Sequence, residues 1–270
     1  MSKRASRQVK TEQKPPVVRT DAGQATNAAS NPLFYRTIVP LDRERHRLAR
    51  LDRPRRPFGF AERTQFIPAV AEEFAAACRD LAILFLPGTG RPNAVFVVGL
   101  SAGQNLLVTA EGEWAAAYVP AFLRRYPFIR GDVEGGEPIV CIDQSYEGLN
   151  QERGEPFFEE AGHTPFLEQQ VGLVNAYFDA SQRSEEFCDL LLSLDLFKSV
   201  TIDVKSNGSS TAVHGLLAVD EEKLNMLPAR DFERLRKAGA LAPIYAHLIS
   251  MGSIGRLSAR LDAIRNGVDG

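Results

Sequence analysis

The chain has 270 residues, of which 44% are hydrophobic and 24% are charged, with 21 Gly and 16 Pro. This composition excludes a collagen-like chain and a wholly disordered one, and the length permits a sizeable buried core. The formal net charge of -2 provides no overall field for a polyanion, so we expect no nucleic-acid partner.

The N-terminal segment is polar and lies in the basic part of the chain. Residues 1–63 contain 15 basic and 6 acidic side chains, whereas residues 132–160 contain nine acidic side chains and a single basic one. No large apolar side chain occurs between Val18 and Leu33. We therefore predict a disordered basic tail over residues 1–31, followed by a single domain over residues 32–270.

The first half of the ordered chain is predicted to be rich in strands. Residues 33–39 are aromatic and β-branched and precede a proline, which is typical of a strand. Residues 41–56 are rich in arginine, and their leucines fit a helical face or a strand equally well. A helix is predicted over residues 67–81, because a proline is tolerated in the first turn and apolar residues recur at helical spacing. Further strands are predicted at 83–86, 94–100, 105–109 and 139–142, with a hairpin turn at 111–112 and a short helix at 120–128.

The second half is predicted to be mainly helical. Helices are expected at 166–178 and 185–197, with Ser184 as the N-cap of the latter. Two strands, 201–204 and 215–219, flank Asn207-Gly208, a turn sequence. Three further helices are predicted at 229–238 (with Gly239 just beyond its end), 241–251 and 253–264. We predict an α+β fold: a mixed, largely antiparallel sheet in the first half, helices concentrated in the C-terminal half, and residues 165–266 as an alternative helical subdomain.

The three cysteines, Cys78, Cys141 and Cys188, lie far apart among apolar neighbours. An odd number without a CxxC pair argues against a disulfide framework or a structural zinc site and favours buried thiols in a reducing compartment.

No apolar run approaches the roughly 20 residues that span a bilayer, and the N-terminus has no apolar signal region. We expect a cytoplasmic protein without a membrane span.

Short motifs along most of the chain together resemble the bacterial SapC family. They cover residues 33–255 and are Phe34-Tyr35, Val39-Pro40-Leu41, His46, 58–61, Ile67-Pro68, Glu73-Phe74, 98–100, 104–106, 112–114, 118–121, 124–128, 141–143 and 241–248. The family is named after a surface-layer gene locus and shares only its name with the permease of a peptide transporter. The resemblance implies a link to cell-surface or envelope functions, and it implies no catalytic residues.

Residues 99–103, Gly-Leu-Ser-Ala-Gly, match the G-x-S-x-G pattern of a hydrolase nucleophile and follow an apolar strand. That motif needs a helix immediately after the serine, whereas residues 104–108 are predicted to form a strand. A glycine-rich hairpin explains both glycines without chemistry. If Ser101 were a nucleophile, its histidine would be His163, His214 or His247.

Residues 143–148, Asp-Gln-Ser-Tyr-Glu-Gly, match the first half of an EF-hand loop. Position 12 of that loop is Gly154 rather than a bidentate glutamate, so an EF-hand is excluded. Weak divalent-cation binding by Asp143, Glu147 and Glu152 is the alternative to a solvated acidic loop. We expect no metal and no cofactor.

The four histidines never occur at the spacing of a metal-binding pair. His247 lies between Ala246 and Leu248 on an apolar helix, so we expect a hydrogen-bonded core histidine. His46 lies among arginines and is the better functional candidate.

Arginines next to aromatic residues are the strongest binding signal in the sequence. Guanidinium groups hold a carboxylate or phosphate through paired hydrogen bonds, and aromatic rings form an apolar wall for its body. The alternative is that the rings fill the core and the arginines pair with Asp132, Glu134 or Asp143; the arginine stretch 43–56 has the same ambiguity. The candidate ligand-binding residues are His46, Asn105, Trp114, Tyr118, Arg124, Arg125 and Tyr126.

Three functional hypotheses follow. The preferred one is a cytoplasmic, non-catalytic binding or accessory protein that recognises an anionic small molecule or a protein segment. The second is an enzyme that uses His46 with a carboxylate such as Asp42 or Asp143 for acid–base chemistry. The third is a structural component of a surface layer.

Overall fold

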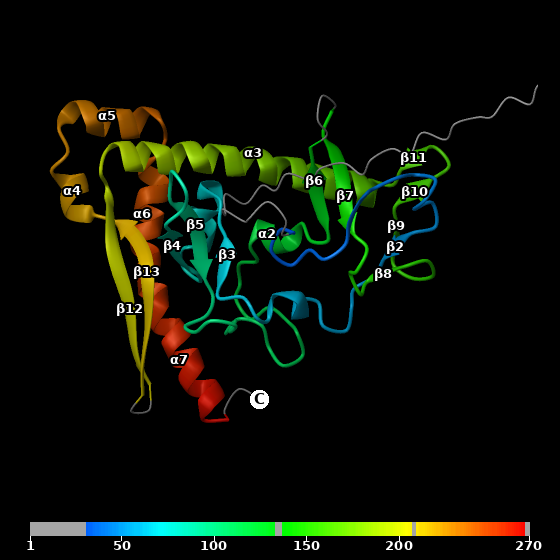
Figure 1. The fold of residues 1–270 in the computed structure, drawn as a ribbon, viewed down its shortest axis with the longest axis horizontal. Coiled ribbons are helices and arrows are strands. Elements are labelled where there is room, and N and C mark those ends of the chain that lie inside the picture. The colour runs from blue at the N-terminus through cyan, green and yellow to red at the C-terminus, as the bar shows by residue number, and fades with distance from the viewer. Residues whose placement is uncertain (1–30, 133–136, 207–208, 268–270) are drawn as a thin grey trace, which may run out of the picture.

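The computed structural model describes residues 31–132, 137–206 and 209–267, so the predicted tail lies outside the described residues except for Asn31. The predicted α+β fold is confirmed, with antiparallel sheets early in the chain and helices toward the C-terminus. Figure 1 shows the long helix α3 (Pro165–Ser193) running across the top of the molecule, over the larger sheet and onward to the smaller ones.

The largest sheet has five strands, and every neighbouring pair in it is antiparallel. Its central strand β4 is apolar and almost wholly buried, as expected for a strand covered on both faces. Strand β5 pairs with β4 in a register that places Ile83 opposite Phe96. In order across the sheet, the strands are β12 (Phe197–Ser206), β13 (Ser209–Val219), β4 (Ala82–Leu86), β5 (Asn93–Val97) and β3 (Phe66–Pro68).

Helices from the C-terminal half share one hydrophobic core with this sheet. The largest buried cluster contains Phe85 and Phe96 from the sheet, Leu191 from α3, Ile244 from α6 (Leu241–Ser250) and Leu257 from α7 (Ile254–Arg265). The C-terminal helices and the first-half strands therefore exclude water from the same interior.

His247 links α6 to two strands of the sheet and is fully buried. Its Nδ1 lies 2.8 Å from the carbonyl oxygen of Ile83, and its Nε2 lies 3.0 Å from the backbone nitrogen of Val219, which donates to it. Both ring nitrogens are thus occupied by backbone groups. The prediction of a hydrogen-bonded core histidine is confirmed.

The prediction of two helices between residues 166 and 197 is wrong, because α3 continues through residue 184 without a break. Its true N-cap is Thr164, whose hydroxyl accepts a hydrogen bond from the backbone of Leu167. The hydroxyl of Ser184 donates to the carbonyl of Ala180 and accepts from the backbone nitrogen of Ala71, each at 2.7 Å. Ser184 therefore caps η2 (Ala71–Glu73), a neighbouring short helix, instead of its own.

Three small sheets lie at the other end of α3 (Figure 1). The first has the order β1-β7-β6 and the second the order β8-β2-β9, while β10 pairs with β11. The arginine-rich stretch, which fitted a helix or a strand, forms hydrogen-bonded turns and the two-residue strand β2. The bounds are β1 (Ile38–Pro40), β2 (Arg50–Leu51), β6 (Phe128–Gly131), β7 (Ile139–Asp143), β8 (Leu149–Asn150), β9 (Glu155–Pro156), β10 (Phe158–Glu159) and β11 (Gly162–His163).

Several first-half predictions are corrected. The strand expected at 33–39 is reduced to β1, because Phe34 adopts a left-handed backbone with φ of 78° inside a turn. The helix expected over 67–81 is reduced to η2 and α1 (Phe74–Ala77), since Pro68 pairs with Val95 in the sheet. The strand expected at 105–109 is absent from the described structure there, apart from one bridge between Val108 and Trp114.

The remaining predicted elements are found with changed bounds. The short helix expected at 120–128 is reduced to α2, because Phe128 already belongs to β6. Gly239 follows α5 with φ of 68°, as predicted for the residue beyond a helix end. The two strands predicted around Asn207-Gly208 are β12 and β13, and the predicted turn itself lies outside the described residues. The other helices are η1 (Gly59–Ala61), α2 (Ala121–Arg124), α4 (Glu221–Asn225), α5 (Ala229–Lys237) and η3 (Met251–Ser253).

Candidate functional site

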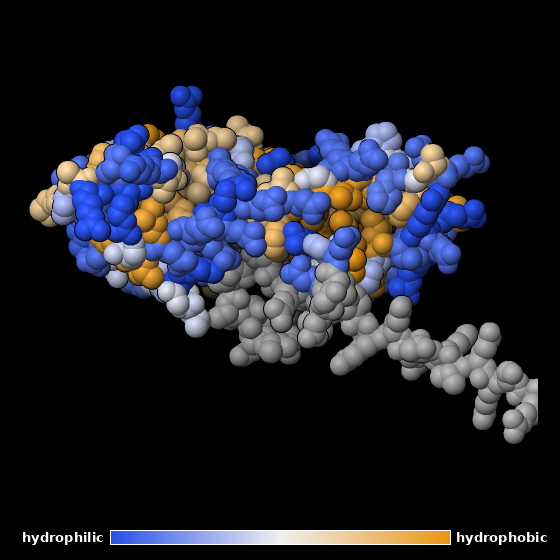
Figure 2. All heavy atoms as spheres, turned by 90° about the horizontal axis from the view of Figure 1, so that it is seen from above, coloured by the Kyte–Doolittle hydropathy of each residue, from blue (hydrophilic) through white to orange (hydrophobic). Residues whose placement is uncertain are grey.

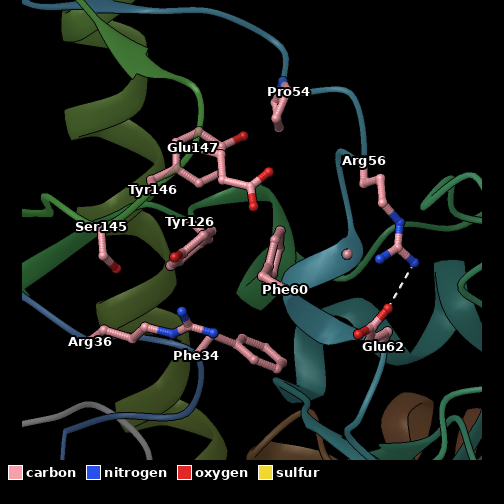
Figure 3. A pocket seen from close by; sticks show the side chains of 11 residues that line it. Phe34, Arg36, Pro54, Arg56, Phe60, Glu62, Tyr126, Ser145, Tyr146 and Glu147 are labelled. Atoms are coloured by element: carbon pink, nitrogen blue, oxygen red, sulfur yellow. Dashed lines mark hydrogen bonds and ion pairs between the residues drawn. The ribbon is translucent and has the colours of Figure 1, made fainter.

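A pocket of about 310 Å³ lies between the region of η1 and the loop that follows β7. Four separate segments form it: residues 34–36, residues 54–62, residue 126 and residues 145–147. Figure 3 shows these segments around the same space. The lining residues are Phe34, Arg36, Pro54, Arg56, Gly59, Phe60, Glu62, Tyr126, Ser145, Tyr146 and Glu147.

One wall of the pocket is a chain of aromatic rings in contact with one another. The ring of Tyr126 lies 4.3 Å from that of Phe60 and 5.2 Å from that of Tyr146, while Phe34 meets Phe60 edge-on at 5.2 Å. Burial, with the nearby charge of Glu147, raises the pKa of Tyr146 to about 12. Burial also raises the pKa of Tyr126, so both phenols are neutral at pH 7. The wall therefore offers uncharged aromatic surface.

Phe34 contributes its ring from a strained backbone. A left-handed conformation costs a residue other than glycine roughly 1–2 kcal/mol, and surrounding contacts must offset this cost. The ring contacts with Phe60 and Phe122 supply such packing. Backbone strain of this kind is common at functional sites. The strain at Phe34 therefore makes this end of the pocket a candidate for ligand contact.

The buried carboxylate of Asp143 holds the pocket's segments together. It accepts hydrogen bonds from the backbone nitrogens of Arg36 at 2.8 Å, Thr37 at 2.9 Å and Ser145 at 3.0 Å, and from the hydroxyl of Ser145 at 2.7 Å. Burial alone would raise the pKa of Asp143, but these hydrogen bonds outweigh burial and lower it. Asp143 thus stays ionised, and its role is to position Arg36 and the 145–147 loop.

The pocket contains two charged groups for which the described residues supply no ion pair. They are the guanidinium of Arg36 and the carboxylate of Glu147, which enter from different segments and are both exposed. Arg56, by contrast, pairs with Glu62 at 2.7 Å, as the dashed line in Figure 3 marks. As far as the described residues go, one positive and one negative group in the pocket have no ion-pair partner.

A second hollow of about 390 Å³ adjoins the pocket and shares Pro54 and Glu147 with it. Two of its arginines are engaged: Arg53 pairs with Glu113 at 2.6 Å, and Arg153 approaches Asp52 at 3.6 Å. The hollow is further lined by Arg55, Gly148, Asn150, Gln151 and Glu152.

Three of the predicted ligand-binding residues form a separate cluster around Glu73. The hydroxyl of Tyr118 donates to Glu73 Oε1 at 2.6 Å, and Arg124 Nη2 lies 3.8 Å from the same oxygen. Trp114 Nε1 donates to the carbonyl of Tyr118 at 2.8 Å. Burial raises the pKa of Glu73, and hydrogen bonds from Tyr118 and the backbone of Ala121 oppose that effect. Tyr118 and Arg124 thus face a carboxylate of the protein itself, and Trp114 supports Tyr118 through its backbone.

The other predicted residues separate from one another. Arg125 is buried, with its guanidinium carbon 4.1 Å from the ring centre of Tyr177 and 4.7 Å from that of Phe122. Asn105 is buried and bonds to the backbone of Ala61 and Leu107. Of the predicted set, Tyr126 is the residue that lines the pocket.

His46 is buried beneath the turn that begins at Asp42. Its Nδ1 lies 3.1 Å from the backbone nitrogen and 3.0 Å from the backbone oxygen of Asp42, while Nε2 has no hydrogen-bond partner among the described residues. Burial lowers the pKa of His46, which favours the neutral ring. The carboxylate of Asp42 accepts a hydrogen bond from the backbone nitrogen of Arg45. His46 therefore contacts the backbone of Asp42 and not its carboxylate.

Residues 100–103 form bends and a turn with no helix after Ser101, so the local geometry of a hydrolase nucleophile is absent there. The predicted hairpin is wrong as well, because no second strand follows within residues 104–109. A Cβ on Gly99 would lie 1.9 Å from the carbonyl oxygen of Gln104, so a close backbone approach accounts for that glycine.

Within the described ranges, no three His, Cys, Asp or Glu side chains converge as metal ligands. The oxygens of Asp143 are occupied by hydrogen-bond donors, as above. Cys78, Cys141 and Cys188 are free and buried.

In the part of the chain that the structure describes, no helix combines the length and apolar character needed to cross a membrane.

The sequence did not single out most of the pocket's residues as a binding site. Phe34 appeared in the predicted strand 33–39 and in a family motif, and Phe60 appeared in a family motif. Tyr146 and Glu147 appeared in the loop compared with an EF-hand, and Arg56 at the end of the arginine stretch. Their common signal was aromatic residues beside arginine or glutamate in loops. That signal is weak, because the four segments meet only in the folded chain.

The comparison with family models identifies the chain. The SapC family model matches residues 41–257, which is most of the chain, so the chain belongs to the SapC family. The match includes the part of the pocket formed by residues 54–62, 126 and 145–147, whereas Phe34 and Arg36 precede it. No curated protein and no solved structure matches the chain significantly.

Proposed function

We propose that this SapC-family chain is a non-catalytic binding protein for a small molecule that bears an anionic group, and that Arg36 receives this group. The proposal rests on the guanidinium of Arg36. This group lines an aromatic pocket, and the described residues give it no ion pair. Guanidinium groups bind carboxylate and phosphate through two parallel hydrogen bonds.

The pocket's dimensions and lining support a small organic ligand. Its volume of about 310 Å³ falls at the lower end of the range for small-molecule sites. The rings of Phe34, Phe60 and Tyr126 offer contact for an apolar or planar body, while Arg36 fixes its orientation. Four charged side chains share the lining with these rings, so the pocket suits a ligand that combines an apolar body with charged groups.

The backbone around Arg36 is already held in place, which also favours binding. Its amide nitrogen donates to Asp143, and so does that of Thr37. A side chain that projects from a fixed backbone loses less freedom when it binds, so more of the contact energy appears as affinity. The hydroxyl of Ser145 in the pocket donates to Asp143 at 2.7 Å, but the lowered pKa of that carboxylate makes it a weak base. We therefore place binding ahead of the acid–base enzyme hypothesis.

We propose a cytoplasmic location and a link to cell-surface or envelope functions together with this binding role, as the sequence and the family name suggest. The structural surface-layer component is the other hypothesis. Fractionation of source cells, followed by detection of the chain in the soluble and surface extracts, tests the location separately from the binding role.

Titration calorimetry at pH 7 tests the binding site with two probes, phenyl phosphate and 3,3-dimethylbutyl phosphate. Each carries a phosphate on an apolar body. We expect binding by the wild type and roughly 10- to 100-fold weaker binding by Arg36→Gln, since this substitution removes charge-assisted hydrogen bonds. Arg230→Gln is the control, because Arg230 lies on α5 and does not line the pocket. Absence of binding by the wild type, or equal affinity in Arg36→Gln, would disprove the proposal.

A further inference from the structure

The pocket's second available charge is the carboxylate of Glu147, and it restricts the kind of ligand that fits. A site for an anion alone would repel that anion with Glu147 while attracting it with Arg36. In Figure 3 the carboxylate of Glu147 points into the space bounded by Pro54, Phe60 and Tyr126. We infer that the ligand is a zwitterion, with its anionic group on Arg36 and an alkylated ammonium group between Glu147 and the aromatic wall. This inference rests on the proposed function and deepens it.

The aromatic wall suits an alkylated ammonium group. Aromatic faces attract cations within about 6 Å of the ring centre, and quaternary ammonium groups are recognised in this way. Because Tyr126 and Tyr146 meet at right angles, with ring centres 5.2 Å apart, they present two differently oriented surfaces beside Glu147. Methyl groups around the nitrogen would contact these apolar surfaces, while the carboxylate of Glu147 would balance the charge.

The neighbouring charged groups leave Glu147 available for this role. Arg56 is paired with Glu62, and Arg53 with Glu113. Arg55 lines the second hollow but not the pocket. The described residues thus give Glu147 no ion pair of its own, and a ligand cation in the pocket would supply one.

The experiment compares phosphocholine with 3,3-dimethylbutyl phosphate, in which carbon replaces the quaternary nitrogen. The two probes share the phosphate and the shape of the head, so their affinity ratio isolates the positive charge. Titration calorimetry at pH 7 measures the ratio in the wild type, in Glu147→Gln and in the control Glu152→Gln. Glu152 is also exposed, but it lines only the second hollow.

We expect the wild type and Glu152→Gln to bind phosphocholine roughly tenfold more tightly than its carbon isostere, and Glu147→Gln to reduce this ratio to near one. Equal affinity of the wild type for the two probes would overturn the zwitterion and leave the anion site at Arg36 intact. A ratio that survives in Glu147→Gln would also overturn it. Failure of both probes to bind would instead disprove the proposed function, on which the inference rests.

Discussion

The hydroxyl of Tyr126 lies 3.2 Å from Oδ2 of Asp143 and donates a hydrogen bond to it. This contact joins the aromatic wall of the pocket to the carboxylate that fixes the backbone of Arg36 and the 145–147 loop. Asp143 itself is fully buried at the end of β7. The most heavily hydrogen-bonded carboxylate near the pocket therefore has a structural role, and the carboxylate available to a ligand is the exposed one of Glu147.

Asp143→Asn is expected to destabilise the fold. An amide group would replace one acceptor oxygen with a donor that faces backbone N–H groups, so at least one buried donor would lose its partner. We expect the free energy of unfolding to fall by roughly 2–4 kcal/mol, measured by urea denaturation at pH 7. Asp132→Asn is the matched control, because Asp132 is a half-exposed partner of Arg130 and should change stability little.

The effect of Asp143 should also depend on pH. Its folded pKa lies below the ordinary value of 3.8, so its stabilising contribution is complete above that value and is lost as pH falls through the folded pKa. We expect the difference in stability between wild type and Asp143→Asn to shrink below pH 4. A difference that stays constant across this interval would show that the carboxylate is not what stabilises the loops.

Gly112→Ala and Gly172→Ala should change stability in opposite directions. Gly112 has φ of 78°, and a Cβ there would lie 2.5 Å from Cβ of Arg56. Because its carbonyl also accepts from Phe58, the substitution would displace the segment that lines the pocket. We expect a loss of roughly 2–4 kcal/mol, with weaker binding of 3,3-dimethylbutyl phosphate.

Gly172 lies exposed within α3, where an added Cβ meets no atom within 4 Å. Its substitution should stabilise the helix by roughly 0.5–1 kcal/mol and leave binding unchanged. Thermal and urea unfolding of the two variants measure both effects. Equal effects of the two substitutions would show that the contact of Gly112 with Arg56 does not constrain the fold.

Elements with local signals could be predicted from the sequence, and the pocket could not. Helices α5, α6 and α7 carry their own periodicity and end signals, and Gly239 marks a helix end wherever that helix packs. Ser184 shows the limit, because its hydroxyl satisfies a distant backbone group, Ala71, while its own helix continues. Figure 2 shows hydrophobic atoms between hydrophilic ones on the upper face, so surface hydropathy does not mark a site there.

The pocket depends on long-range pairing that no local pattern encodes. β1 and β7 pair through Val39 and Ile142, which brings Arg36 to the loop beyond Asp143. The sequence analysis favoured arginine beside aromatic residues, and Tyr126 from that predicted set lines the pocket. It could not distinguish Arg36, which the described residues leave unpaired, from Arg124, which approaches the buried Glu73.

Arg125→Lys should lower stability and leave pocket binding intact. The planar guanidinium of Arg125 is 1% exposed and stacks on the rings of Tyr177 and Phe122, a contact that an ammonium group cannot reproduce. We expect a loss of about 2 kcal/mol in the free energy of unfolding. Arg124→Lys is the control, since Arg124 is half-exposed and should stay near wild-type stability. Lost binding of 3,3-dimethylbutyl phosphate at unchanged stability would instead make Arg125 a ligand-binding residue.

His247 should make the folded chain less stable in mild acid. Burial lowers its folded pKa from 6.5 to about 4, so between these values the unfolded chain binds a proton that the folded chain does not. The contribution of the neutral His247 to the free energy of unfolding is therefore complete above pH 6.5, and it is lost as the pH falls toward 4. We expect a loss of about 2 kcal/mol from this residue between pH 7 and pH 5.

Urea denaturation at pH 7 and pH 5 measures this loss in the wild type, in His247→Gln and in His214→Gln. His247→Gln should be less stable at pH 7, because Ile83 and Val219 lose well-placed partners, but its stability should change less between the two pH values. His214 is exposed on β13, so His214→Gln should keep the wild-type difference. If His247→Gln retained the full wild-type difference, acid sensitivity would have to come from groups other than the buried imidazole that connects α6 with β4 and β13.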